Sequence, residues 1–359
     1  MDSTPTRTQV IAEHKRSGGR IAAVFPVHYS RALFRAFNIL PVEVWGGGRT
    51  GNAGDAHLQA YTCSVVRGVL SAHLTGMLRD AELYCVPHTC DSLQGLGSLF
   101  LDLVDPGRPV IPIYLPRDEG PAAVAFMASE LRAIYDRLAE LTGSRPSDAD
   151  LQRAIDRECE ADSVLAAMLE LQGRLALPAR AFYAAARSRE YLPAEQFAAA
   201  GRRLLETTVR REEPAGVPIL LSGIVPEPEE ILDQLDAAGA SIVADDMACC
   251  GRRNYAMSTN SDPFGRMAEQ ILGGPPDSTR GVAVERRLAH LLSLASARRV
   301  RAAVFYEVKF CEPEAFYLPQ LRRGLEEAGI KTLALEVDIS ERPSHQIATR
   351  IEALLETLA

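Results

Sequence analysis

The stretch RIAAVFPVHYSRALFRAFNILPVEVW, residues 20–45, sets two short apolar runs on either side of a segment with helical periodicity. Residues 20–27 predict a strand, residues 30–38 a helix and residues 40–45 a second strand. Apolar runs without strict alternation indicate strands that are buried on both faces, as in a parallel sheet. We therefore expect this stretch to form a strand, helix, strand unit within an α/β fold.

The same alternation extends outward from this stretch and later starts again. Before residue 118, further strands are predicted in AELYCVP and RPVIPIYLP; after residue 216, they are predicted in VPILLSG, ASIVADD, RAAVFYEV and IKTLALEV. Between these parts, residues 119–210 carry apolar side chains at a spacing of three to four, which predicts long helices that serve in packing. The sequence thus predicts two doubly wound parallel-sheet domains of the flavodoxin or Rossmann type. A helical segment joins them, and the expected boundaries are 1–118, 119–215 and 216–359.

Composition and charge exclude several classes of protein. A chain of 359 residues with 47% hydrophobic and 24% charged residues is large enough for two domains. The net charge of −8 and the lack of a basic stripe argue against nucleic-acid binding. The N-terminus is polar, unlike a secretory signal, and no apolar run approaches the roughly 18 residues of a membrane span. We therefore expect a cytoplasmic protein that binds neither nucleic acid nor membrane.

The chain has seven cysteines, an odd number that does not suit a disulfide framework in a protein without a signal sequence. Cys63, Cys90 and Cys311 each fall in a loop that follows a predicted strand. In open α/β sheets, ligands bind at the carboxyl ends of strands, so these three positions are candidates for a site. Cys85 lies inside a strand, where core packing is the better interpretation, and Cys159 lies in the helical segment as an incidental thiol.

Spacing alone leaves the role of the three strand-end cysteines open. Structural zinc sites usually show paired CxxC spacing, and this chain has none. An iron–sulfur cluster tolerates dispersed ligands, and three cysteines leave one iron of a [4Fe-4S] cluster open to substrate or another ligand. Buried thiols without a metal remain the alternative.

Seven segments, taken in order, carry a more specific signal. They are FPVHYSRALFRAFNILPVEVWGGG, GDAHLQAYTCSVVRG, VPHTCDS, LLSGIVPEPEEILDQLDAAGASIVADDMACCGRR, DPFGRMAEQIL, KFCEPEAFYLPQLRRGLEEAGIKTLALEVD and QIATRIEALLE. Together they resemble the iron–sulfur subunits of the 2-hydroxyacyl-CoA dehydratase and benzoyl-CoA reductase family. The resemblance runs from about residue 20 to 357 and is weakest over 119–210.

The resemblance implies a subunit in which Cys63, Cys90 and Cys311 hold one [4Fe-4S] cluster. It implies an oxidoreductase or lyase of anaerobic metabolism that reduces the thioester of an acyl-CoA by one electron at low potential, giving a ketyl radical. It also implies a separate iron–sulfur activator that hydrolyses ATP, which fits the absence of a GxxxxGK[ST] motif here. The family works in pairs of related subunits, so the expected partner is a paralogous subunit or a second copy of the chain.

One departure from the family pattern is the adjacent pair Cys249 and Cys250. Adjacent thiols rarely ligate one cluster, so we expect at least one of them to be a packing residue. The alternative is an extra ligand or a larger double-cubane [8Fe-9S] cluster. A further alternative for the whole chain is an electron-relay or cluster-scaffold subunit that lacks a substrate site of its own.

Candidate catalytic residues are His28, Ser30 and Glu43. His28 and Ser30 follow the first predicted strand, where the family builds its substrate pocket. His28 is either a proton carrier or a satisfied surface histidine. Arg252 and Arg253 follow a strand that ends in two aspartates, so they would hold either a phosphate of CoA or the aspartates themselves.

Overall fold

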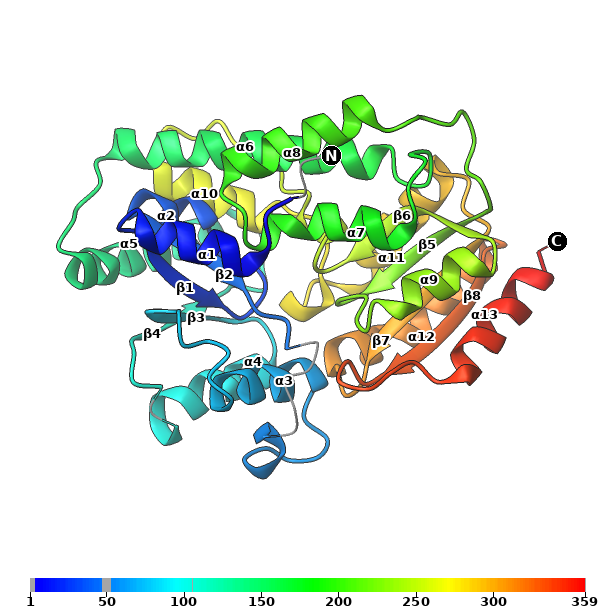
Figure 1. Ribbon diagram of the computed structural model, residues 1–359, viewed down its shortest axis with the longest axis horizontal. Helices are drawn as coiled ribbons and strands as arrows, with labels where there is room; N and C mark the ends of the chain where they lie inside the picture. The colour runs from blue at the N-terminus through cyan, green and yellow to red at the C-terminus, as the bar shows by residue number, and fades with distance from the viewer. Residues whose placement is uncertain (1–3, 47–52, 105, 359) are drawn as a thin grey trace.

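The computed structural model describes residues 4–46, 53–104 and 106–358, and in these it shows two four-stranded, all-parallel sheets with helices on both faces (Figure 1). The strand order is β2-β1-β3-β4 in the first sheet and β6-β5-β7-β8 in the second. This confirms the predicted α/β fold with two doubly wound sheets.

The first sheet is covered by helices from both the N-terminal part and the rest of the chain. Its elements are α1 (Arg7–Arg16), β1 (Arg20–Val24), α2 (Arg31–Ala36), β2 (Ile39–Glu43), α3 (Ser64–Leu74), β3 (Leu83–His88), α4 (Asp91–Ser98) and β4 (Val110–Tyr114). Along β1, Ile21 and Ala23 pack toward α1, α3 and α4, whereas Ala22 and Val24 pack toward α2 and α5. The two apolar faces explain why this strand reads as a continuous apolar run.

Helix α1 is not among the elements that the sequence pattern predicts. Its only buried residue is Val10, so it lacks the apolar periodicity on which a helix prediction depends. A local signal is nevertheless present, because Thr6 and Gln9 form a capping box that satisfies the first backbone N–H groups of the helix.

The helical segment contains α5 (Pro121–Thr142), α6 (Asp148–Glu170), α7 (Ala179–Arg187) and α8 (Ala194–Thr207). Helix α5 begins with a proline, which lacks the N–H that would be unpaired there, and ends at Gly143 with a φ of 70°. Helices α6 and α8 run side by side along the top of the molecule in Figure 1. None of the described helices is long and apolar enough to cross a membrane.

The second sheet repeats the architecture of the first. Its elements are β5 (Val217–Gly223), α9 (Glu230–Ala237), β6 (Ala240–Met247), α10 (Pro263–Leu272), α11 (Val284–Ala297), β7 (Ala302–Val308), α12 (Glu312–Glu327), β8 (Lys331–Val337) and α13 (His345–Glu356). Helix α10 leaves this half and packs against α5, where Phe264 and Met267 join the core beneath the first sheet. The two halves therefore share hydrophobic cores.

Buried charges also join the two halves. The Glu43 carboxylate, at the end of β2, is fully buried and lies 2.6 Å from the guanidinium of Arg253, which follows β6. The Tyr29 hydroxyl donates to the same carboxylate at 2.8 Å, and Arg31 lies 3.4 Å away. Because a buried charge without a partner is costly, these contacts fix how the halves sit against each other.

We expect Arg253→Met to lower the free energy of unfolding by about 3–5 kcal/mol, because it leaves the buried Glu43 carboxylate short of its main counter-charge. Urea denaturation followed by circular dichroism measures the change. Arg145→Gln is the matched control, since Arg145 pairs with Asp136 on the surface and such pairs contribute less than about 1 kcal/mol. Equal effects of the two substitutions would contradict the role assigned to Arg253.

Candidate functional site

Three cysteines occupy the same structural position in three different helices. Cys63, Cys90 and Cys311 are the N-cap residues of α3, α4 and α12, and none of the three side chains makes a capping hydrogen bond. The N-terminus of a helix carries unpaired N–H groups and a partial positive charge, which favours a thiolate over a thiol. Each thiol thus lies at the positive end of a helix.

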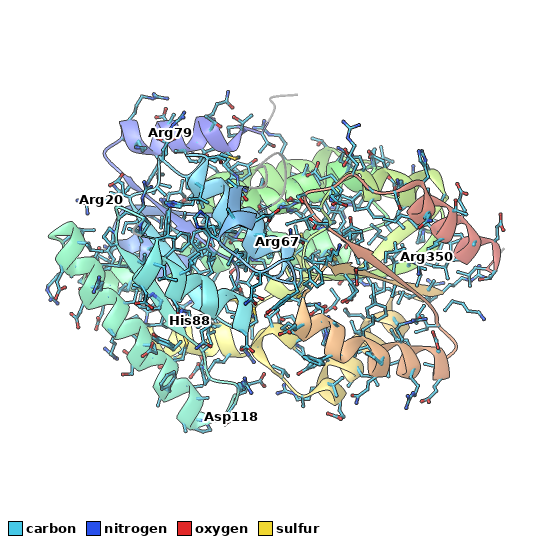
Figure 2. All side chains as sticks on the ribbon, turned by 90° about the horizontal axis from the view of Figure 1, so that it is seen from below. Arg20, Arg67, Arg79, His88, Asp118 and Arg350 are labelled. Carbon is cyan, nitrogen blue, oxygen red and sulfur yellow. The ribbon has the colours of Figure 1, made fainter. Side chains whose placement is uncertain are left out.

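The two halves of the molecule bring Cys63 and Cys311 together. The backbone N–H of Ser64, at the start of α3, donates to the carbonyl of Lys309 at 3.2 Å, just before Cys311. One turn into α3, Arg67 forms an ion pair with Asp338 after β8. Figure 2 shows Arg67 near the middle of the molecule. This junction holds the start of α3 against the loop that leads into α12.

The three thiols influence one another electrostatically. A hydrogen bond from Cys311 lowers the pKa of Cys63, and the backbone N–H groups of Val65 and Val66 act in the same direction. The same hydrogen bond, together with burial, raises the pKa of Cys311, and the Cys90 thiol adds to that increase. Burial raises the pKa of Cys90 to about 11. The first proton lost from this group therefore comes from Cys63.

Thiolates are the donors that hold iron–sulfur clusters. Within the described residues, no three His, Cys, Asp or Glu side chains are placed to ligate one metal ion. A cubane cluster does not require such convergence, because each thiolate binds a different iron. Cys63 and Cys311 are buried and Cys90 is half-buried, so the group is shielded from water while one side stays accessible. The three thiols therefore have the donor chemistry of a cluster with three cysteine ligands.

A small polar cavity of about 210 Å³ lies beside Cys90. Its walls include His88 and Thr89 from the end of β3, and Arg117 and Arg280 from later segments. Neither ring nitrogen of His88 has a hydrogen-bond partner in the described residues. The cavity thus offers unused polar groups next to one of the three thiols.

A buried ion network supports the start of α12. The Glu314 carboxylate, one turn after Cys311, lies 2.9 Å from Arg252 and 3.2 Å from Arg287. Asp246, at the end of β6, pairs with the same two arginines at 3.3 and 2.8 Å. These positive charges outweigh burial and hold the pKa of Glu314 and of Asp246 below the usual values. Both carboxylates are thus ionised and fixed, which makes them structural.

The candidate catalytic residues have structural partners. His28 is buried rather than on the surface, and its Nε2 lies 3.0 Å from Asp277, while its Nδ1 has no partner in the described residues. The Ser30 side chain caps α2 by accepting the N–H of Leu33. Glu43 belongs to the ion pairs between the halves described above. None of the three lines the cavity beside Cys90.

The arginines after β6 serve different partners. Arg252 pairs with the second of the two preceding aspartates, Asp246, and also with Asp277 and Glu314. Arg253 pairs with Glu43 instead of either aspartate. The expectation that the arginines hold the preceding aspartates is therefore met by Arg252 alone. The pairing with Glu43 is hidden from sequence reasoning because 210 residues separate the partners.

The adjacent cysteines pack against each other. Cys249 and Cys250 are buried after β6, with their sulfur atoms 3.7 Å apart. Burial raises the pKa of Cys250, with further effects from Cys249, Asp245 and Arg187. Those neighbours differ from the ones that act on Cys63, Cys90 and Cys311.

Sequence reasoning missed Glu307 of β7. Burial raises the pKa of this carboxyl to about 8, helped by the nearby charge of Glu314, and its Oε2 atom has no hydrogen-bond partner in the described residues. The available signal was a single acid in the apolar run RAAVFYEV that leads toward Cys311. Glu307 thus holds a proton at neutral pH close to the start of α12.

We expect Glu307→Gln to remove a pH dependence of stability. The pKa of Glu307 is raised from 4.5 to about 8 in the folded protein. Its contribution to the free energy of unfolding is therefore complete below pH 4.5 and is lost as the pH rises through 8. The amide mimics the protonated acid and does not titrate. The difference in the free energy of unfolding between variant and wild type should therefore grow by about 2 kcal/mol, in favour of the variant, as the pH rises from 6 to 8. Urea midpoints at both pH values measure this. Glu327→Gln, on the exposed face of α12, is the control, and a gain that does not grow with pH would contradict the assignment.

Known proteins resemble this chain over most of its length. The sequence model of the 2-hydroxyglutaryl-CoA dehydratase D-component matches residues 26–358. The (R)-phenyllactyl-CoA dehydratase beta subunit of Clostridium sporogenes is 25% identical over 97% of this chain and 94% of its own length. The beta subunit of lactoyl-CoA dehydratase from Anaerotignum propionicum is 27% identical over 96% and 94%, and a benzoyl-CoA reductase subunit from Thauera aromatica is 23% identical over 89% and 85%. The chain belongs to the 2-hydroxyglutaryl-CoA dehydratase D-component family.

Proposed function

We propose that this chain is the [4Fe-4S] subunit of an acyl-CoA dehydratase or reductase that depends on a separate ATP-hydrolysing activator. Cys63, Cys90 and Cys311 would hold the cluster. The observation that carries the proposal is the placement of these three thiols at three helix N-termini from both halves of the molecule. When bound, the cluster supplies single low-potential electrons for the reduction of a CoA thioester.

The residues of the chain prepare this site in two ways. The backbone N–H groups at the start of α3 and the nearby guanidinium of Arg67 favour the thiolate form of Cys63, which is the form that binds iron. Burial of Cys63 and Cys311 keeps water away from the ligands on the side of the domain junction. The half-buried Cys90 and the polar cavity beside it leave one approach to the site.

The relatives support an enzyme that works with a partner. Two of them are named as beta subunits of dehydratases that act on acyl-CoA thioesters, and another is named as part of benzoyl-CoA reductase. We therefore propose an acyl-CoA substrate for the assembled enzyme and a paralogous subunit, or a second copy of this chain, as the partner.

A second candidate function is electron relay to a partner that binds the substrate. Pockets for ligands of drug-like size usually measure about 300–1,000 Å³, and the cavity beside Cys90, at about 210 Å³, is smaller. In this case the chain would hold the same cluster, while the acyl-CoA would bind to the paralogous subunit.

The role of the three thiols predicts the result of single serine substitutions on protein purified without oxygen. Cys63→Ser, Cys90→Ser and Cys311→Ser should each remove most of the visible absorption of the cluster, because serine replaces a soft thiolate with a hard hydroxyl. Cys249→Ala is the matched control, and it should keep the spectrum of the wild-type protein. Loss of the spectrum in the control, but not in the three serine variants, would overturn the ligand assignment.

Substrate binding separates the two candidate functions. If this chain binds the acyl-CoA, a CoA thioester such as benzoyl-CoA or lactoyl-CoA should change the electron paramagnetic resonance signal of its reduced cluster. An unchanged signal in the isolated chain, with a change once the paralogous subunit is added, would identify the relay role. No change in either sample would contradict both functions.

A further inference from the structure

The function proposed above makes no use of the adjacent cysteines after β6. The sulfur atoms of Cys249 and Cys250 lie 3.7 Å apart, close enough for a hydrogen bond between the two thiols. The exposed fractions of the two residues are 2% and 0%, so the protein encloses the pair. Two thiols in contact can join as a disulfide, whereas a lone thiol has no partner for this reaction.

The backbone fixes the position of this pair. The N–H of Cys249 donates to the carbonyl of Ile224 at 3.1 Å. The N–H of Cys250 donates to the carbonyl of Met247 at 3.0 Å. Two consecutive peptide groups are thus anchored to the end of the sheet, which keeps both thiols next to each other in the folded protein.

A positive charge lies close to the pair. Burial and the neighbouring Cys249 raise the pKa of Cys250, whereas the guanidinium of Arg187 lowers it. Arg187 is held in place by ion pairs with Glu190 and Glu227, each at 2.7 Å. Reaction with an oxidant requires the thiolate, which burial disfavours and the guanidinium favours. The pair should therefore resist a trace of oxidant and react when the oxidant is in excess.

The turn that follows the pair carries two arginines with structural roles. Arg252, two residues after Cys250, lies 2.9 Å from Glu314 in the first turn of α12. Arg253 lies 2.6 Å from Glu43 in the first half of the molecule. A shift of the Cys250 backbone would therefore be felt both at the start of α12 and at the contact between the halves.

We propose that Cys249 and Cys250 form a reversible disulfide when the protein meets a peroxide. In the first step, one sulfur bonds to an oxygen of hydrogen peroxide, the O–O bond breaks and one water leaves, which gives a sulfenic acid. In the second step, the other sulfur attacks the first, the S–O bond breaks and a second water leaves. The two thiols lose two electrons and two protons, and the peroxide is reduced to two waters.

The geometry of neighbouring residues makes this bridge easy to reopen. The sulfur atoms must approach from 3.7 Å to about 2.05 Å for the bond to form. Adjacent α-carbons lie about 3.8 Å apart, which is less than the roughly 4.4–6.8 Å that is usual for disulfides. A strained disulfide is reduced more readily, so a simple thiol should restore the pair. The proposal goes beyond the acyl-CoA function and does not depend on the cluster.

Mass spectrometry tests this proposal on the full chain after treatment with hydrogen peroxide. Free thiols are alkylated in urea, and trypsin then releases residues 212–252, a peptide whose only cysteines are Cys249 and Cys250. We expect this peptide to be lighter by two hydrogens and to carry no alkyl group. Dithiothreitol added before alkylation should restore a doubly alkylated peptide. Cys159, which is buried and contacts Gln270, serves as the internal control because its peptide holds no second cysteine.

Variants distinguish the bridge from general oxidation. Cys249→Ser and Cys250→Ser should each abolish the bridge, and in at least one of them the remaining thiol should be trapped as a sulfenic acid that dimedone labels. Cys159→Ser is the matched control and should form the bridge as wild type does. The proposal is overturned if residues 212–252 stay doubly alkylated at peroxide concentrations that oxidise Cys159, or if dithiothreitol does not reopen the bridge.

Hydrogen exchange tests whether the bridge is felt at α12. Amide exchange at the start of α12 should become roughly twofold faster or more after oxidation and return on reduction, because the turn that holds Arg252 has moved. Peroxide also attacks iron–sulfur clusters, so the change must exceed that in Cys250→Ser treated in the same way. Equal changes in wild type and Cys250→Ser would contradict a link between the bridge and α12.

Discussion

The buried charges between the two halves are the constraint on which the rest of the structure depends. Glu43 from the first half faces Arg253 from the second, and His28 faces Asp277 in the same manner. All four groups are buried, and separating the halves would take the main counter-charge, Arg253, away from the Glu43 carboxylate. The relative position of the sheets is thereby fixed, and with it the approach of Cys63 to Cys311.

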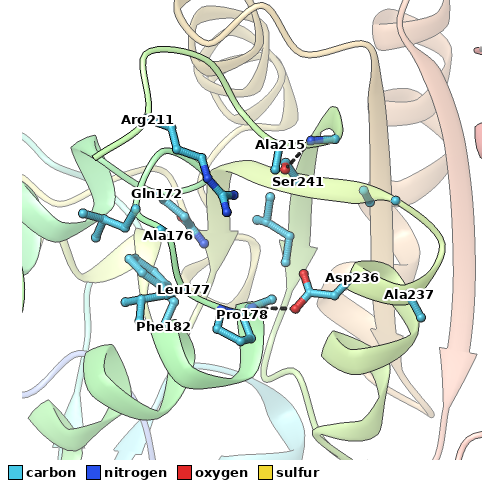
Figure 3. Close-up of a pocket in the computed structure, with 17 residues that line it drawn as sticks. Gln172, Ala176, Leu177, Pro178, Phe182, Arg211, Ala215, Asp236, Ala237 and Ser241 are labelled. Carbon is cyan, nitrogen blue, oxygen red and sulfur yellow. Dashed lines mark hydrogen bonds between the residues drawn. The ribbon is translucent and has the colours of Figure 1, made fainter. Parts of the chain in front are cut away.

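This arrangement places different chemistry at the two edges of the second sheet. At the carboxyl edge, the N-terminus of α12 carries Cys311 and rests on the ion network around Glu314. At the amino edge, a cavity of about 560 Å³ lies between the sheet and the helical segment (Figure 3). The ion network holds the start of α12 in one position, because each of its carboxylates is buried between the same two arginines.

Much of this could be predicted from the sequence because local patterns encode it. The apolar runs identified the two parallel sheets, and strand ends drew attention to Cys63, Cys90 and Cys311, which the structure places at helix N-caps. Their role as ligands and the domain boundaries near residues 118 and 215 stay predictions. Long-range pairing was not predictable: the move of α10 into the first core and the Glu43 to Arg253 contact depend on residues more than 100 positions apart.

The central claim is that three thiols of one chain hold a single cubane cluster. The most direct measurement is the content of iron and acid-labile sulfide per chain, with a Mössbauer spectrum, on protein purified without oxygen. The account predicts about four irons and four sulfides, with one iron site distinct from the other three because it lacks a cysteine. About eight irons would bring Cys249 or Cys250 into a larger cluster, and no iron after anaerobic reconstitution would contradict the cluster altogether.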